Sequence, residues 1–133
     1  MTDVRLVGRR YETQPFEVTE ASIRAYMEAV GDTRVDGALE APPTYAMVYG
    51  YDAYWQLWHD QEVGMDVAHL VHGDQRFTFH RAVRPGDRIQ TSGRLTNVTA
   101  RGDMELVTFE LTSRDAEDLP VSDGTALFII RKP

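Results

Sequence analysis

Apolar residues recur along this chain with two different periods, and the period changes near Gly64. A first helix is indicated by four apolar residues at the i, i+3, i+4, i+7 spacing: Ile23, Tyr26, Met27 and Val30. Thr19 is placed to cap this helix, and Gly31 is placed to end it. After Gly64, apolar and polar residues alternate, which is typical of strands with one buried face.

A second helix is expected from about Thr44 to Asp60, because Pro42 and Pro43 can open a helix but cannot lie inside one. It has almost no polar face, and its apolar residues are Tyr45, Met47, Val48, Tyr49, Tyr51, Tyr54, Trp55, Leu57 and Trp58. Such a pattern predicts a helix surrounded by protein. Gly50 in its middle costs about 1 kcal/mol relative to alanine. A close approach of the backbone to a sheet would explain this glycine.

The expected strands are long and meet in hairpins. An edge strand covers Tyr11 to Val18, where Pro15 is tolerable only at an edge or a bulge. The other strand segments are Leu70 to Val83, Ile89 to Thr99, Leu106 to Thr112 and Val121 to Arg131, with turns at Pro85-Gly86-Asp87 and Arg101-Gly102-Asp103. One apolar helix followed by such strands predicts an α+β protein, in which an antiparallel sheet curls around a central helix.

The 133 residues fit one domain, residues 1–133, with no linker or repeat. No apolar run approaches the roughly 18 residues of a membrane span. The first ten residues also lack the apolar stretch of a signal peptide. We therefore expect a cytoplasmic protein without a membrane partner. The absence of cysteine excludes disulfides, thiolate metal sites and a cysteine nucleophile. No serine-hydrolase, dinucleotide, P-loop or zincin motif occurs.

The formal charge of −7 argues against nucleic-acid binding, which depends on neutralising phosphates. The positive charges are unevenly spread, because the segment from Arg76 to Arg101 holds six arginines and a single acid, Asp87. Two interpretations are open: the arginines dock a small anionic ligand, or they keep exposed strand faces solvated.

Three stretches, AVGD, APPTYAMV and HGDQRFTFHRAVRPGD, resemble in order and spacing the N-terminal-type MaoC-like dehydratase domain. The resemblance covers roughly Phe16 to Arg131. It implies the hotdog fold and a dimer that holds an acyl thioester between two hotdogs. It also implies reversible hydration of trans-2-enoyl thioesters of CoA or acyl-carrier protein, with no cofactor.

The resemblance assigns Asp32 the role of the family's catalytic aspartate, which orients and deprotonates water. In active members a histidine lies five residues later, but here that position is Gly37, and Arg34-Val35-Asp36 lacks the usual Asn-Pro. The family also contains subunits that have lost this pair and hold substrate for a catalytic partner. An aspartate after a glycine at a helix end is also common turn chemistry.

His72 is the candidate replacement acid, because the HGDQRF segment lies close to the acyl pocket in the family, and Gly73 beside it is a candidate substrate contact. A hydrogen-bonded strand histidine is the other interpretation of His72. His69 and His72 point to opposite faces of an extended strand, so we expect no metal site there.

The remaining candidates for substrate binding lie at the second helix and in the arginine-rich segment. Backbone amides around Pro43, Thr44 and Tyr45 are candidates to hold the thioester oxygen at the positive end of the helix. Arg84 and Arg88, which flank the Pro-Gly-Asp turn, are candidates to dock the phosphates of CoA or of a carrier arm.

The leading hypothesis is an R-specific enoyl-thioester hydratase or 3-hydroxyacyl-thioester dehydratase, or the substrate-binding subunit of one. The first alternative is a hotdog thioesterase using Asp52 in the central helix. The second is a catalytically silent acyl-binding subunit that needs a heteromeric partner. Without a partner we expect a homodimer, because the sheet leaves an edge that needs cover.

Overall fold

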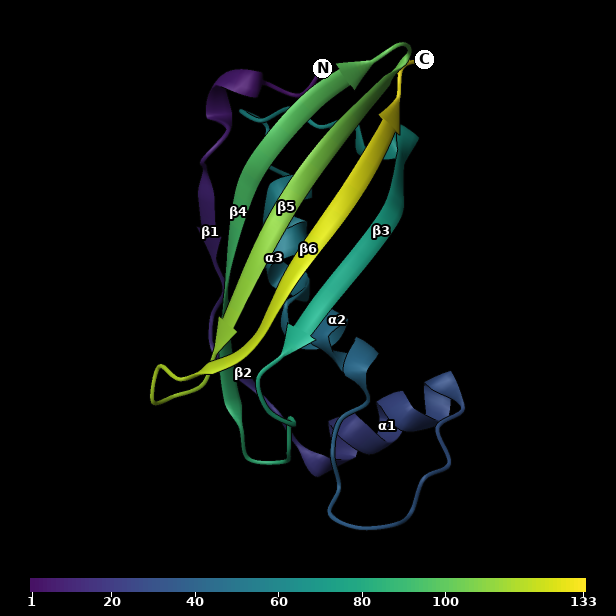
Figure 1. Cartoon of the computed structure of the whole chain (residues 1–133), viewed down its shortest axis with the longest axis vertical. Helices are drawn as coiled ribbons and strands as arrows, with labels where there is room; N and C mark the ends of the chain where they lie inside the picture. The colour runs from purple at the N-terminus through teal and green to yellow at the C-terminus, as the bar shows by residue number, and fades with distance from the viewer.

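A computed structural model describes residues 1–133 as one curved antiparallel sheet wrapped around a helix (Figure 1). The strands are β1 (Arg10–Glu12), β2 (Phe16–Glu17), β3 (Leu70–Phe79), β4 (Arg88–Arg101), β5 (Met104–Arg114) and β6 (Pro120–Arg131). The helices are α1 (Glu20–Val30), α2 (Ala46–Tyr49) and α3 (Tyr51–Trp58), with short 3-10 turns at η1 (Val4–Leu6), η2 (Pro43–Tyr45) and η3 (Val67–His69). This is the predicted α+β hotdog architecture.

The sheet order is β1-β4-β5-β6-β3, and β2 pairs separately with β4. The four long strands curve around α3, and α1 lies beyond the end of the sheet that is farther from the two chain termini (Figure 1). All pairings are antiparallel. β3 is an edge strand with no neighbour on its outer side.

The predicted edge strand is divided in two. Pro15 has no N–H for a ladder bond, so pairing with β4 stops after β1 and resumes at β2. Between them, the hydroxyl of Thr13 accepts a bond from the Thr91 amide at 3.0 Å. The chain therefore follows β4 as an edge, as predicted, but in two short pieces.

The first helix forms as predicted from its caps. The Thr19 hydroxyl accepts a hydrogen bond from the Ser22 amide, and Gly31 ends the helix in the left-handed conformation at φ 76°. Ile23 and Met27 are its buried residues. The apolar stripe of this helix is what attaches it to the rest of the core.

The second predicted helix differs from the structure in two respects. It is divided into a 3-10 turn, α2 and α3, which meet at Gly50, although its end at Trp58 is close to the predicted end near Asp60. It is also not surrounded by protein, since Tyr51 and Trp55 are 47% and 49% exposed. Within a single chain, the sheet covers only one side of α3.

Gly50 lies where the helix touches the sheet, as its position in the sequence suggested. A Cβ at this residue would lie 3.6 Å from Leu111 Cδ2 and 3.8 Å from Thr91 Cγ2. The helix on either side of Gly50 fills two different core clusters: α3 packs with Phe109 and Phe128, whereas α2 packs with residues of α1 and Ile89. The helix therefore contributes side chains to both core clusters.

The strands after Gly64 agree with the alternation of the sequence, except that β3 ends at Phe79 and leaves residues 80–87 irregular. The β4–β5 hairpin turns at Gly102, at φ 61°. In β4, Gly93 has no space for a side chain, because a Cβ there would lie 2.2 Å from Phe109 Cζ.

We predict that Gly93→Ala lowers the free energy of unfolding by about 1–3 kcal/mol, because the new methyl group must displace the buried ring of Phe109. Urea unfolding followed by circular dichroism measures the change. Thr99→Ala, at an exposed position of the same strand, is the control and should shift stability by less than about 0.5 kcal/mol. Equal midpoints for Gly93→Ala and the wild type would contradict this packing.

Candidate functional site

The segment that follows α1 carries Asp32 and is built on the end of that helix. The Asp32 amide donates to the carbonyl of Met27 at 2.8 Å, which closes the last turn beyond Gly31. Nine residues later the segment is anchored again, where the Ala41 amide donates to the carbonyl of Val83 at 2.8 Å. These two bonds fix the ends of the loop.

The carboxylate of Asp32 is occupied by the side chain of Arg34. Arg34 Nε donates to both carboxylate oxygens at 2.9 and 3.1 Å, and Arg34 Nη2 donates to Oδ2 at 2.6 Å. The backbone amide of Arg34 donates to Oδ1 as well. These hydrogen bonds hold the pKa of Asp32 below its usual value. Asp32 is therefore a weaker base than a free aspartate.

Gly37, at the position of the family's histidine, offers no side chain to complete the pair. Its φ is 73°, and a Cβ there would meet nothing within 4 Å, so the glycine is needed for the backbone conformation and not for lack of space. The adjoining Val35 is 90% exposed. The loop around Gly37 lines a hollow of about 270 Å³ together with Arg24 and Met27 of α1.

A larger cavity of about 410 Å³ lies between the start of the second helix and the segment after β3. Its apolar lining comes from Ala41, Pro42, Pro43, Ala46, Tyr49, Phe79, Ala82 and Val83. Its charged and polar lining comes from Arg34, Glu40, His80 and Arg81. A cavity with an apolar lining and a few polar groups at one side suits a small acyl ligand.

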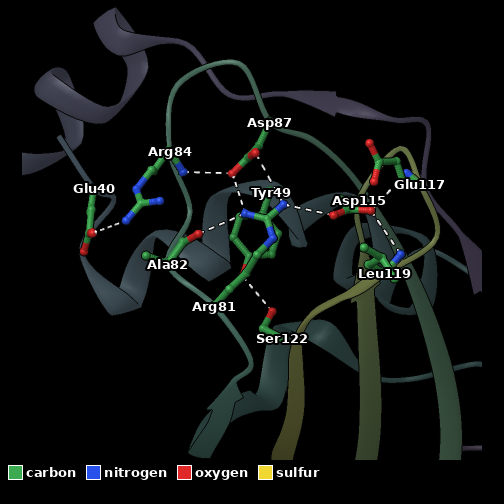
Figure 2. A network of polar contacts seen from close by, with 10 residues as sticks. All are labelled: Glu40, Tyr49, Arg81, Ala82, Arg84, Asp87, Asp115, Glu117, Leu119 and Ser122. Carbon is green, nitrogen blue, oxygen red and sulfur yellow. Dashed lines mark hydrogen bonds and ion pairs between the residues drawn. The ribbon is translucent and has the colours of Figure 1, made fainter. Parts of the chain in front are cut away.

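One wall of this cavity is held by Arg81, which joins two separate turns (Figure 2). Arg81 Nη1 donates to Asp87 Oδ2 at 2.8 Å in the Pro-Gly-Asp turn, and Nη2 donates to Asp115 Oδ2 at 3.3 Å. Asp115 in turn accepts bonds from the amides of Glu117 and Leu119 in the β5–β6 hairpin. Arg81 is therefore a structural tie at the edge of the cavity, and its charge is already compensated.

The start of the second helix offers fewer free amides than predicted. Pro42 and Pro43 have no N–H, and the Tyr45 amide donates to the carbonyl of Pro42 at 2.9 Å. Only the Thr44 amide has no protein acceptor. The Thr44 hydroxyl accepts a bond from Tyr26 at 2.6 Å, which ties α1 to this turn. The donor that the turn presents is thus the amide of Thr44, and the prediction that Tyr45 contributes a free amide is wrong.

His72 and Gly73 lie away from Asp32. His72 is the third residue of β3, about 23 Å of extended strand before Phe79 at 3.3 Å per residue. β3 begins near the chain termini and runs toward the α1 end (Figure 1). Within one chain, the structure therefore does not bring His72 and Asp32 together, and neither residue lines the cavity. Their catalytic roles remain predictions.

The local contacts of His72 and Gly73 have their own structural reasons. His72 Nε2 is bonded to Gln75 Oε1 at 3.0 Å, and Tyr54 donates to the same oxygen at 2.9 Å. A bulge between His72 and Asp74 brings His72 and Gln75 to the same face. A Cβ at Gly73 would lie 2.7 Å from Ile129 Cδ1. The glycine is therefore needed for packing at the bulge.

Arg84 and Arg88 flank the cavity region but have carboxylate partners. Arg84 Nη2 donates to Glu40 Oε1 at 2.9 Å (Figure 2), and Arg88 Nε lies 3.7 Å from Glu17 Oε1. Arg76 and Arg81 are paired too, so four of the six arginines of this segment face acids. The positive charge of this segment is therefore largely neutralised by carboxylates that lie next to its arginines in the folded protein.

Two further candidates have simple surroundings. Asp52 lies on the exposed side of α3 and accepts a hydrogen bond from Gln56 at 2.9 Å, and it does not line the cavity. His69 Nδ1 is bonded to Asp66 Oδ2 at 2.8 Å. No group of three or more His, Cys, Asp or Glu side chains is placed to hold a metal ion.

None of the helices has the length and apolar character needed to span a membrane.

His80 is a polar residue of the cavity that the sequence analysis missed. Its Nε2 is bonded to Asp123 Oδ2 at 2.8 Å, and the residue lines the cavity beside Arg81. The histidine stands in the FTFHRAVRPGD segment, but nothing in the sequence showed that Asp123, 43 residues later, lies next to it. A histidine oriented by a carboxylate is a common acid–base arrangement.

We predict that Arg34→Gln raises the pKa of Asp32, because the hydrogen bonds and the positive charge that lower it are lost. Titration of the Asp32 carboxyl carbon by NMR measures the change. Arg24→Gln is the matched control, since Arg24 pairs with Glu20 on exposed α1 and should leave Asp32 unaltered. An unchanged Asp32 pKa in Arg34→Gln would show that the ion pair does not form in solution.

Comparisons with known proteins agree with this architecture. The model of the family described as "FAS1-like, dehydratase domain region" matches residues 5–124. A UPF0336 protein of Leifsonia xyli subsp. xyli is 34% identical over 139 residues, which cover 95% of this chain and 93% of that protein. A UPF0336 protein of Streptomyces avermitilis is 34% identical over 118 residues, covering 79% of each chain.

Solved structures show the same fold. The HadBC (3R)-hydroxyacyl-ACP dehydratase complex of Mycobacterium tuberculosis matches with a TM-score of 0.78 at 20% identity, over 93% of this chain and 96% of that chain. A protein named MaoC-like dehydratase matches with a TM-score of 0.84 at 20% identity, over 96% of this chain and 42% of that chain. The family match over most of the sequence and the shared hotdog sheet lead to one conclusion: the chain belongs to the FAS1-like dehydratase domain family of MaoC-like hotdog proteins.

Proposed function

We propose that this chain is the substrate-holding subunit of a heteromeric 3-hydroxyacyl-thioester dehydratase, acting on thioesters of CoA or acyl-carrier protein. The observation that carries the proposal is the state of Asp32. Its carboxylate is bonded by Arg34, and glycine stands where the family's histidine would be. The chain therefore lacks a free base and its paired acid at the family's catalytic position.

The reaction defines what such a subunit must leave to a partner. Dehydration removes a proton from the α-carbon and the hydroxyl group from the β-carbon, which is protonated and leaves as water, so it needs a base, an acid and donors for the enolate oxygen. In this proposal a second hotdog chain supplies the base and the acid. This chain supplies the cavity for the acyl group and the amide of Thr44, which follows the lining residue Pro43. The free edge of β3 is available for pairing with such a chain.

The comparisons support the heteromeric form. HadBC is a complex of two different chains, and so is ChsH1–ChsH2 of Mycobacterium tuberculosis, which matches with a TM-score of 0.67. The charge around the cavity supports a ligand whose buried part is uncharged, since Arg34, Arg81 and Arg84 are each paired with acids. The acyl group fits this description better than the phosphates of its carrier.

His80 favours a second candidate function, an autonomous enoyl-thioester hydratase. His80 lines the cavity and is oriented by Asp123, so it has the arrangement of an acid–base residue. In that case the chain would turn over substrate by itself, and His80→Gln would remove the activity. This candidate and the subunit proposal differ in what the isolated chain does.

The ultraviolet absorbance of crotonyl-CoA, incubated with the purified chain, tests the proposed function. We expect no loss of the enoyl band with this chain alone, and faster loss when it is added to a second hotdog chain that carries the complete Asp-to-His motif. Release of free thiol would indicate the thioesterase alternative instead.

Turnover by the chain alone would overturn the subunit proposal, and variants then identify the residues. Asp32→Asn and His72→Ala would lower the rate by a factor of about 100 to 10,000 if these two residues act as base and acid. His80→Gln would do so if His80 is the acid–base group. Arg94→Gln, at an exposed position of β4 outside the cavity, is the control and should leave the rate unchanged.

Phosphate docking by Arg84 and Arg88 remains part of the proposal and has its own test. We expect Arg88→Ala to weaken acyl-CoA affinity more than Arg84→Ala, because Arg88 has the looser partner. The loss should be a factor of up to about 5 at low ionic strength and should vanish at high salt. Arg101→Ala, at the β4–β5 hairpin, is the control. If Arg84→Ala and Arg88→Ala bind acyl-CoA as tightly as the wild type at low ionic strength, these arginines only keep the sheet surface solvated.

A further inference from the structure

Four of the residues that line the 410 Å³ cavity are buried: Pro42, Ala46, Tyr49 and Val83. Ala46, Tyr49 and Val83 are 4%, 3% and 4% exposed, whereas Phe79 is 40% exposed. Tyr49 is by far the largest of the four. Its side chain therefore decides how far the cavity reaches into the protein.

The Tyr49 side chain is fixed at both ends of its ring. Its hydroxyl is hydrogen-bonded to Ser122 Oγ of β6 at 2.6 Å, and both residues are buried (Figure 2). The ring packs edge-on against Tyr45, with centroids 6.1 Å apart. Turning Tyr49 aside would leave the Ser122 hydroxyl buried without this partner, which is unfavourable. These two contacts therefore hold the Tyr49 side chain in its position in the cavity wall.

No channel continues behind Tyr49. The next residue, Gly50, brings the helix backbone close to Thr91 and Leu111 of the sheet. Beyond it, the space between α3 and the sheet is filled by fully buried side chains: Tyr54, Leu57, Phe109 and Phe128. An acyl chain entering between Pro43 and Phe79 would therefore meet a closed end at Tyr49.

From this geometry we infer that Tyr49 is a specificity-determining residue, which ends the acyl cavity and restricts the subunit to thioesters of short acyl chains. The inference rests on the proposed function, because it concerns the ligand of the same cavity. In an open apolar channel, each added methylene increases affinity through burial. In a closed cavity, the added methylenes have to remain outside or displace the ring.

Calorimetric titration with saturated acyl-CoAs tests the inference, because these ligands cannot be hydrated. We expect the affinity of the wild type to be highest for butanoyl- or hexanoyl-CoA and to fall for octanoyl- and decanoyl-CoA. Tyr49→Ala opens the end of the cavity and should raise the affinity for decanoyl-CoA by about 10-fold or more. Tyr49→Phe keeps the ring, so the preference for short chains should persist.

Tyr11→Ala is the matched control. Tyr11 is also a buried tyrosine with a hydrogen-bonded hydroxyl, which donates to Asp60 Oδ2 at 2.7 Å, but it does not line the cavity. It should therefore not increase the affinity for decanoyl-CoA. Should Tyr49→Ala fail to fold, as judged by thermal unfolding, Tyr49→Leu gives the same test, because it also shortens the side chain.

The outcomes separate this inference from the proposed function. Wild type that binds no acyl-CoA of any length would overturn both. Wild type whose affinity rises steadily up to decanoyl-CoA would overturn the role of Tyr49 and leave the subunit proposal intact. The same holds if Tyr49→Ala or Tyr49→Leu binds decanoyl-CoA no better than the wild type.

Discussion

The contact between the central helix and the concave face of the sheet at Gly50 is the constraint on which the rest of the structure depends. At Gly50 the helix is in van der Waals contact with the sheet, since a Cβ at this residue would lie 3.6 Å from Leu111 Cδ2 and 3.8 Å from Thr91 Cγ2. On one side of it, α3 places Tyr54 and Leu57 in the larger core cluster. On the other side, α2 belongs to the smaller cluster with α1. A helix held farther from the sheet would separate the two clusters.

The same contact produces the cavity. Because α2 is drawn against the sheet, Tyr49 reaches Ser122 of β6 and closes the space toward the core. The outer side of α2 stays accessible between the loop before it and the segment after β3. Two ties hold these walls in place: Tyr26 with Thr44 on the helix side, and Arg81 with its two aspartates on the sheet side. These hydrogen bonds connect the walls of the cavity to the helices and to the turns at the end of the sheet.

The electrostatics of this region show why charge counted along the sequence misleads. Residues 76–101 are strongly basic as a segment, yet the carboxylates that face their arginines come from elsewhere in the chain, such as Glu17, Glu40 and Asp115. Asp32 is affected in the same way, since Arg34 lowers its pKa and takes up its hydrogen-bonding capacity. The departure from the family's motif is thus double: the histidine is lost, and the aspartate is engaged.

The sequence alone determined the fold and the family, because both depend on local signals. The period of apolar residues identifies each helix and strand, Thr19 and Gly31 bound α1, and the three motif stretches carry the resemblance. Even the contact of Gly50 with the sheet was suggested by the cost of a glycine inside a helix.

Only the tertiary structure decided which side chains meet, because that depends on strand register and loop closure over long sequence separations. It placed His72 at the far end of β3 from Asp32 and brought Asp123 to His80. It also set Tyr49 against Ser122, 73 residues away, and so gave the cavity its closed end. A local pattern cannot contain this information, since a shift of one residue in a strand turns every side chain to the other face.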